Sequence, residues 1–211
     1  MSFDSPQDAR TDAKRRAIIA VAREVFLSSG YAAASMSEIA ARLGGSKGTL
    51  YNYFRSKEEL FVAFMNESCE DLLDFMDHLP ATAEADHSMR DDLIELGVAF
   101  LSSLTRDSFV AIHRLVIAEA GRFPELGRLF YENGPARGRQ RFTQYFERVI
   151  AAGRLPPNDP QEVGTRLKDL VLSDVYTRRL WGVLGPLSPD ELRAHVTRSV
   201  DIFLLAFGER D

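Results

Sequence analysis

The chain has 211 residues, of which 45% are hydrophobic and 27% charged, and its formal net charge is −5. This composition is typical of a folded globular protein and excludes an intrinsically disordered one, and no apolar run approaches the ~18 residues that a membrane-spanning helix needs. The polar N-terminus lacks the apolar core of an export signal, and one cysteine, Cys69, cannot form an internal disulfide, so we expect a reducing, cytoplasmic setting.

The charge is unevenly divided along the chain. Residues 1–57 contain nine Lys and Arg against five acidic residues, a net charge of +4, which leaves −9 for residues 58–211. This asymmetry suggests a basic N-terminal part with an anionic partner and an acidic remainder without one. We therefore expect a domain boundary near residue 57, with one domain at 1–57 and a second at 58–211.

Helical periodicity runs through the sequence, and alternating strand patterns are almost missing, so we expect an all-α fold. Glycines and prolines separate the periodic segments, and the pair Pro156-Pro157 marks the clearest break. The predicted helices span residues 8–29, 36–43, 47–54, 56–79, 88–105, 107–121, 125–133, 136–153, 161–184 and 189–207.

Capping residues mark the starts of the second, third and fourth helices. Ser35 and Glu38 have the spacing of a capping box, residues 56–59 form another, and Ser46 is the expected N-cap of the third helix. Gly44-Gly45 ends the second helix after two turns. Two short helices joined by a glycine turn, and braced by the longer helix before them, make a helix-turn-helix.

The third helix has an apolar face, formed by Leu50 and Phe54, and an opposite polar face. Short polar side chains on the polar face can reach base edges in a major groove, while phenols and lysines contact phosphates on its walls. The residues suited to these roles are Lys47, Gly48, Thr49, Tyr51, Asn52, Tyr53 and Lys57. The alternative for the two tyrosines is packing against neighbouring helices with their hydroxyls in water.

This part of the chain resembles the DNA-binding signature of TetR-type transcriptional regulators, in the stretches GGSKGTLYNYF (44–54) and SKEELF (56–61). The resemblance extends over residues 14–62, and it implies a homodimer on an approximately palindromic operator, regulated by a small-molecule inducer. Gly45 departs from the family pattern, which commonly has a small apolar residue such as valine there. Carried over by position, the DNA-contacting residues are Ser35, Ser37, Lys47, Gly48, Thr49, Tyr51, Asn52, Tyr53 and Lys57.

In that family the C-terminal helices bind the inducer and form the dimer, and residues 114–135 resemble a subtype found in drug-efflux and stress regulators. We expect an inducer pocket walled by bulky apolar residues with a few polar groups, suited to an apolar or aromatic ligand. For each candidate taken alone, a place in the core is the favoured alternative. The candidates are Phe64, Phe100, Leu104, Ile112, His113, Val116, Phe123, Tyr176 and Trp181.

The last two helices carry apolar stripes that can close a four-helix dimer interface with a second copy. The alternative is that both stripes cover this chain's own core. The residues predicted for the interface are Val163, Leu167, Leu170, Val196, Val200, Phe203 and Phe207.

Other functions find little support. The four histidines lie far apart without the spacing of a zinc site, so we expect no metal, no cofactor and no enzyme activity. Cys69 falls on the apolar stripe of the fourth helix and is expected to be a small buried residue, with redox sensing as the alternative. The main competing function is an interaction or small-ligand-binding protein that keeps the helix-turn-helix for structure alone.

Overall fold

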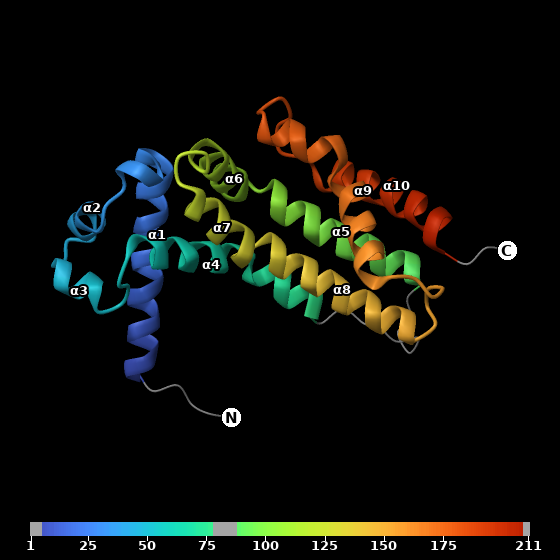
Figure 1. Ribbon diagram of the computed structural model, residues 1–211, viewed down its shortest axis with the longest axis horizontal. Helices are drawn as coiled ribbons and strands as arrows, with labels where there is room; N and C mark the ends of the chain where they lie inside the picture. The colour runs from blue at the N-terminus through green and yellow to red at the C-terminus, as the bar shows by residue number, and fades with distance from the viewer. Residues whose placement is uncertain (1–5, 78–87, 209–211) are drawn as a thin grey trace. The chain divides into compact units, whose positions relative to one another are not determined.

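The computed structural model describes the backbone of residues 6–77 and 88–208 and the side chains of residues 10–68 and 88–208 (Figure 1). All regular structure in these ranges is helical, so the prediction of an all-α fold is confirmed. The polar stretch expected between the fourth and fifth helices, and the side chain of Cys69, lie outside the described residues. The helices are α1 Pro6–Ala33, α2 Met36–Arg42, α3 Lys47–Tyr51, α4 Lys57–Asp77, α5 Met89–Thr105, α6 Asp107–Glu119, α7 Pro124–Asn133, α8 Pro135–Ala151, α9 Pro160–Leu180 and α10 Pro189–Phe207.

The predicted caps begin the short helices. Ser35 Oγ accepts the backbone N–H of Glu38 at 3.2 Å, and Ser46 Oγ accepts that of Thr49 at 3.2 Å. These bonds satisfy donors that the first turn of a helix leaves without a partner. Local side-chain chemistry therefore sets where α2 and α3 start.

Helix α3 is shorter than the predicted segment 47–54. The backbone N–H groups of Tyr53 and Phe54 both donate to the carbonyl of Leu50, at 3.0 Å each. A carbonyl shared in this way tightens the chain and ends the helix. Tyr53 and Phe54 thus lie in the turn that follows α3.

The chain divides into two compact units. The first comprises the chain up to Ser68 together with Leu115–Asn133, and the second comprises Cys69–Arg114 and the chain from Gly134 onwards. Helices α4 and α6 each contribute residues to both units. A functional boundary after residue 57 stays a prediction.

The first unit is organised around the end of α1. Gly30 interrupts the helix with φ +80°, a conformation that residues with a side chain rarely adopt. The break turns Tyr31 into the core, where its ring packs against Phe26, Phe61 and Phe123 at centroid distances of 5.7, 5.5 and 6.2 Å. Helices α1 and α4 and the α6–α7 connection therefore share one aromatic cluster.

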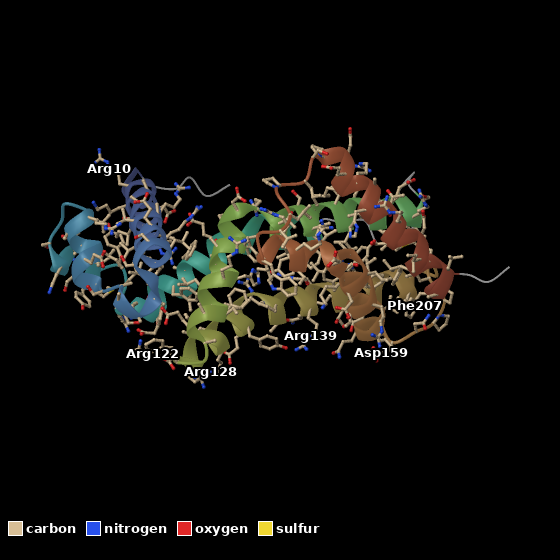
Figure 2. All side chains as sticks on the ribbon, turned by 90° about the horizontal axis from the view of Figure 1, so that it is seen from above. Arg10, Arg122, Arg128, Arg139, Asp159 and Phe207 are labelled. Carbon is tan, nitrogen blue, oxygen red and sulfur yellow. The ribbon has the colours of Figure 1, made fainter. Side chains whose placement is uncertain are left out.

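Helix α1 begins well before its first buried residue, Ile18. Residues 10–17 are exposed on all sides of the helix. Figure 2 shows Arg10 standing clear of the helices beside this first part of α1. Burial of apolar surface, the usual support of a helix in a globular protein, is missing from these two turns.

The second unit is built from α5, α8, α9 and α10 around an apolar core. Gly97 of α5 lies so close to α10 that a Cβ added there would stand 2.5 Å from Val196 Cγ1. A buried ion pair joins Arg154 to Asp92 at 2.7 Å, with side chains only 8% and 4% exposed. The helices of this unit are therefore packed closely and fastened by a shielded charge pair.

Helix α9 is broken at Ser173, which has φ +37°. Two carbonyls just before the break accept hydrogen bonds from α10: His195 Nε2 donates to Val171 at 2.9 Å, and Ser199 Oγ donates to Leu170 at 3.1 Å. Backbone carbonyls in an apolar core are costly without a donor. The two α10 side chains therefore stabilise the broken course of α9.

The residues predicted for the dimer interface face this chain's own core, which is the alternative named for the two stripes, and their part in a dimer contact stays a prediction. Val163, Leu167, Val196, Val200 and Phe203 are at most 1% exposed, and Leu170 and Phe207 are partly buried against the same core. The apolar stripes are the faces on which α9 and α10 pack against each other and against α5. The outward side of α10 instead presents Ile202 and Leu205, which are 55% and 84% exposed.

The close approach at Gly97 gives a stability prediction. Gly97→Ala should lower the free energy of unfolding by about 1–3 kcal/mol, because the new methyl group needs space that Val196 occupies. Gly138→Ala on α8 is the matched control, since an added Cβ there meets nothing within 4 Å. Alanine favours a helix interior over glycine by up to ~1 kcal/mol, so the control should be neutral or stabilising. Urea unfolding measures both; unchanged stability of Gly97→Ala would contradict the close packing.

Candidate nucleic-acid interface and ligand-binding region

Helix α3 is held in the first unit by its apolar side. Leu50 and the following Phe54 are 1% and 0% exposed. The guanidinium of Arg15 lies over the Phe54 ring, 5.1 Å from its centroid, in cation–π geometry. Burial of these two side chains fixes the rotation of α3 and leaves its polar side at the surface.

The predicted DNA-contacting residues lie at that surface. Tyr53 and Lys57 are half-buried, and the other seven are exposed, among them Tyr51 at 48%. Thr49 Oγ1 is 3.0 Å from the capping oxygen of Ser46, so its hydroxyl is oriented by a neighbour before any DNA arrives. The exposed set is Ser35, Ser37, Lys47, Gly48, Thr49, Tyr51 and Asn52.

Lys57 has a role inside the protein that the sequence did not reveal. Its ammonium donates to the backbone carbonyl of Tyr31 at 2.8 Å. It also lies 4.3 Å from the centroid of the Tyr31 ring. The Tyr31 hydroxyl donates to Glu58 Oε1 at 3.2 Å, and burial, reinforced by Glu58, raises the pKa of this phenol. Lys57 thus fastens the start of α4 to the end of α1 and still has N–H groups for a phosphate.

The candidate ligand-binding residues are divided between the units. Phe64, Val116 and Phe123 belong to the first, and the remaining six belong to the second. Trp181 is not part of a buried pocket: it follows the last residue of α9, and its side chain is 76% exposed. Phe100 packs against Phe142 at 5.1 Å as part of the core of the second unit, and Leu104 and Ile112 are half-buried and buried.

His113 and Tyr176 are brought together by α6 and α9. Their rings meet edge to face, with centroids 5.5 Å apart. His113 Nδ1 lies 3.1 Å from the carbonyl of Phe109, which can only accept, so Nδ1 carries the proton and Nε2 the lone pair in the neutral ring. Burial lowers the pKa of His113 to about 4, against an opposing effect of the Phe109 carbonyl. The imidazole is therefore neutral at physiological pH.

The hydroxyl of Tyr176 is buried and has no hydrogen-bond partner among the described residues. Burial also raises the pKa of this phenol, so it stays protonated and remains a donor. A buried hydroxyl without a partner costs roughly 1–3 kcal/mol and calls for an explanation. The hydroxyl belongs to a ring that packs edge to face on the neutral imidazole of His113. It is therefore a hydrogen-bond donor at an aromatic contact.

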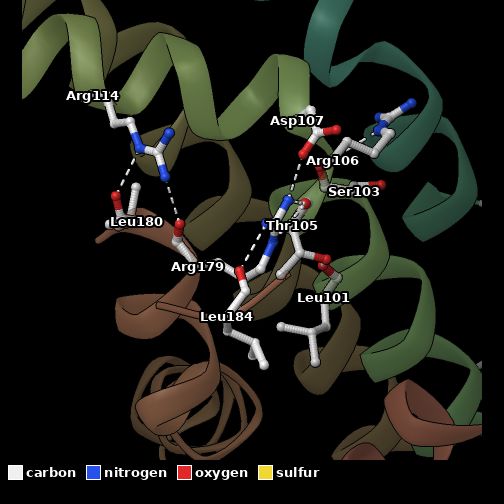
Figure 3. A network of polar contacts seen from close by, with 9 residues as sticks. All are labelled: Leu101, Ser103, Thr105, Arg106, Asp107, Arg114, Arg179, Leu180 and Leu184. Atoms are coloured by element: carbon white, nitrogen blue, oxygen red, sulfur yellow. Dashed lines mark hydrogen bonds and ion pairs between the residues drawn. The ribbon is translucent and has the colours of Figure 1, made fainter. Parts of the chain in front are cut away.

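Two arginines fix the helices around this pair (Figure 3). Arg179, 5% exposed, donates to the carbonyls of Thr105 and Leu184 at 2.9 and 3.0 Å and pairs with Asp107 at 2.6 Å. It thereby joins the end of α5, the start of α6 and the end of α9.

Arg114 of α6 completes the network by donating to the carbonyls of Leu180 and Arg179 at 2.7 and 2.8 Å. Arg114 satisfies carbonyls that the last turn of α9 leaves without a helical partner, and Arg179 does the same for Thr105 at the end of α5. Sequence analysis did not single them out. Their signal in the sequence is weak, because an arginine in a predicted helix is usually solvated.

An exposed polar helix held by a glycine turn, on a chain built only of helices where it is described, defines a helix-turn-helix DNA-binding regulator. The chain belongs to the TetR family of bacterial regulatory proteins, whose signature matches residues 18–64. Residues 91–209 match the C-terminal domain of AefR-like transcriptional repressors. The protein is a transcriptional regulator and not an enzyme. Within the described residues no helix is long and apolar enough to cross a membrane, and no His, Cys, Asp and Glu group forms a metal site.

Solved structures with similar chains cover nearly the whole protein. A TetR-family regulator from Mesorhizobium loti is 30% identical with a TM-score of 0.81, over 95% of this chain and 99% of that one. The flavonoid-responsive regulator FrrA is 32% identical with a TM-score of 0.77, over 95% and 100%.

Curated relatives match over different lengths. The transcriptional activator FasR of Mycolicibacterium smegmatis is 44% identical over 62 residues, only 29% of this chain and 28% of that protein. The repressor Rv1474c of Mycobacterium tuberculosis is 26% identical over 166 residues, 79% of this chain and 82% of that protein. The long match is thus to a repressor, and the match to an activator is confined to a short segment.

The depressed pKa of His113 gives a pH prediction. The unfolded chain protonates this histidine near its ordinary pKa of 6.5, whereas the folded chain does so only near 4. The stability that depends on the neutral ring is complete above pH 6.5 and is lost as the pH falls toward 4. We expect a loss of about 3 kcal/mol in the free energy of unfolding from this residue.

His113→Asn isolates the effect, because it keeps an N–H near Nδ1 and cannot titrate. Urea unfolding of both proteins between pH 7 and 4 measures the difference, since all other titrating groups are shared. Parallel pH profiles would show that His113 is not held neutral by burial.

Proposed function

We propose that the protein is a ligand-responsive repressor that binds an approximately palindromic operator as a homodimer and releases it when a small molecule binds. The match of residues 91–209 to repressor C-terminal domains, and the long match to Rv1474c, favour repression over activation. A bacterial regulator of this kind acts in the cytoplasm, where the chromosome lies. The observation that carries the proposal is the exposed polar side of α3 opposite the buried Leu50.

DNA reading is assigned to that exposed side. Thr49 and Asn52 are short polar residues suited to base edges, and the phenols of Tyr51 and Tyr53 are suited to phosphates. Gly48 lets the backbone approach a phosphate closely. Lys47 and Lys57 add charge at the starts of α3 and α4. Ser35 and Ser37, at the start of α2, complete the set with hydroxyl donors.

The dimer is assigned to the outward side of the last helices. Ile202 and Leu205 of α10, and Trp181 and Val183 after α9, are large apolar side chains that are 55% to 84% exposed. Large exposed apolar residues can mark an interaction surface, and these lie before the start and near the end of α10. Two copies joined there would form the four-helix contact that sequence analysis expected, with different residues of the same helices at the contact.

The ligand is assigned to the region of His113 and Tyr176. A small neutral molecule with an aromatic body and at least one hydroxyl or carbonyl would satisfy the Tyr176 hydroxyl. FrrA, similar over the whole chain, is flavonoid-responsive, and a flavonoid has these groups. We therefore infer a flavonoid-like or other phenolic inducer.

Coupling between ligand and DNA is assigned to α6 and α4, the two helices that pass from one unit into the other. His113 lies on α6, and just after α6 Phe123 packs on Tyr31, which in turn holds Lys57 and Glu58 at the start of α4. A shift of α6 on ligand binding would tilt α4 and move the two reading helices away from the ~34 Å spacing of successive major grooves.

Selection from random-sequence duplex DNA tests the DNA-binding function. At near-physiological salt the purified protein should enrich a two-fold symmetric motif, which also tests the dimer. Asn52→Ala should change or relax the preferred bases and cost about 1–3 kcal/mol on the selected motif, with little change on unrelated DNA. Equal loss on both DNAs would remove Asn52 from base reading, and no enrichment by the unsubstituted protein would favour the interaction-protein alternative.

Tyr176→Phe tests the ligand region. Removing a hydroxyl that has no described partner should leave the ligand-free stability unchanged or slightly higher, because no bond is lost. Affinity for a flavonoid such as naringenin, measured by calorimetry, should fall by about threefold to tenfold. Tyr145→Phe is the matched control, since that hydroxyl is also buried without a described partner but lies in the α8 core. Equal effects of the two variants would move the ligand away from Tyr176.

A further inference from the structure

The start of α1 lies outside the apolar core of the first unit. Residues 10–17 carry four cationic side chains and the single acid Asp12, and all are exposed. Within the described part of the chain, no carboxylate pairs with Arg10, Lys14 or Arg16. The segment precedes residue 18, where the family signature begins. A cationic helix without an apolar face is suited to an anionic partner.

The position of each cation along α1 determines on which side of the helix its side chain lies. Lys14 lines a small hollow together with Ser46, Thr49 and Leu50 at the start of α3, one helical turn before the buried Ile18. Arg10 precedes Lys14 by four residues and therefore lies on the same side of the helix. In Figure 1 the first turns of α1 extend past the α2–α3 pair.

The other cations of α1 differ in position. Arg15 is held against Phe54 at the end of α3. Arg16 and Arg23 lie about 180–200° around the helix from Lys14. Arg23 lines a separate surface groove with Arg42 of α2. The cations of α1 therefore fall into a side next to α3 and a side turned away from it.

We propose that Arg10 and Lys14 form an additional contact with the DNA backbone, beside the groove that α3 enters. The proposal rests on the DNA-binding function proposed above. A helix that crosses the backbone next to the reading helix meets phosphates, and ammonium and guanidinium groups bind these without regard to base sequence. The contact adds affinity and fixes the approach of α3, while the choice of bases stays with α3.

Counting released counterions tests the proposal. Each phosphate contact contributes about 0.9 to the slope of log affinity against log salt concentration on duplex DNA. The double variant Arg10→Ala and Lys14→Ala should lower the magnitude of this slope by roughly two per protomer, on both a selected motif and an unrelated duplex of equal length. The motif recovered by selection should not change.

The matched control is the double variant Arg16→Ala and Arg23→Ala. It removes the same charge from exposed positions of the same helix, on the side turned away from α3. Its slope should equal that of the unsubstituted protein. Equal loss in the two double variants would overturn the contact and leave only a general effect of net charge.

Further outcomes separate the proposal from the function on which it rests. An unchanged slope in the Arg10 and Lys14 variant, with circular dichroism showing intact helices, would overturn the additional contact while leaving α3 as the reading helix. Failure of the unsubstituted protein to bind any duplex, at any salt concentration, would overturn the DNA-binding function itself. A changed motif in the Arg10 and Lys14 variant would contradict the division between affinity and base choice.

Discussion

The break at Gly30 and the burial of Tyr31 are the constraint on which the first unit depends. A continuous α1 would carry Tyr31 away from the core, whereas the left-handed glycine turns it between the aromatic rings of α1, α4 and the α6–α7 connection. Its hydroxyl and carbonyl then bind Glu58 and Lys57. One residue thus fixes where α4 starts, and the reading helix α3 lies between these two fixed ends.

The second unit is governed by polar groups that helix ends and breaks leave without partners. Arg179 and Arg114 satisfy carbonyls at the ends of α5 and α9, and α10 satisfies those beside the break at Ser173. Such bonds hold helices at defined angles where apolar packing alone would allow sliding. Against this background two buried hydroxyls, those of Tyr145 and Tyr176, have no partner among the described residues. Under the proposed function, a ligand is the partner of the Tyr176 hydroxyl.

The sequence predicted well what depends on neighbours in the chain. The caps at Ser35 and Ser46 act over three residues, so helix starts were readable, and the apolar face of α3 followed from helical spacing. The end of α3 could not be predicted. Two backbone N–H groups share the Leu50 carbonyl there, and no residue type in the sequence indicates such sharing. The DNA-contacting positions and the ligand region remain predictions that the structure makes specific.

Features that depend on residues far apart in the chain could not be predicted from the sequence, for a physical reason. An apolar stripe on α10 reads the same whether it meets its own core or a second copy, so only the structure placed Phe203 inside. The break in α9 has no glycine or proline at Ser173, since it is stabilised by side chains more than twenty residues away. Likewise, Lys57 looked like a phosphate ligand alone because its partner Tyr31 is 26 residues earlier.

The positions of the charged residues in the structure explain what the uneven charge of the chain can do. A net charge of −5 opposes binding to DNA in general, because the acidic residues repel phosphates from most of the surface. Under the proposed function, those cations of residues 1–57 that lie next to α3 attract phosphates toward the helix to which base reading is assigned. Repulsion elsewhere then orients the approaching protein, and non-specific association by other faces is suppressed. Under that proposal, the acidic residues contribute to specificity although none of them is assigned to the DNA contact.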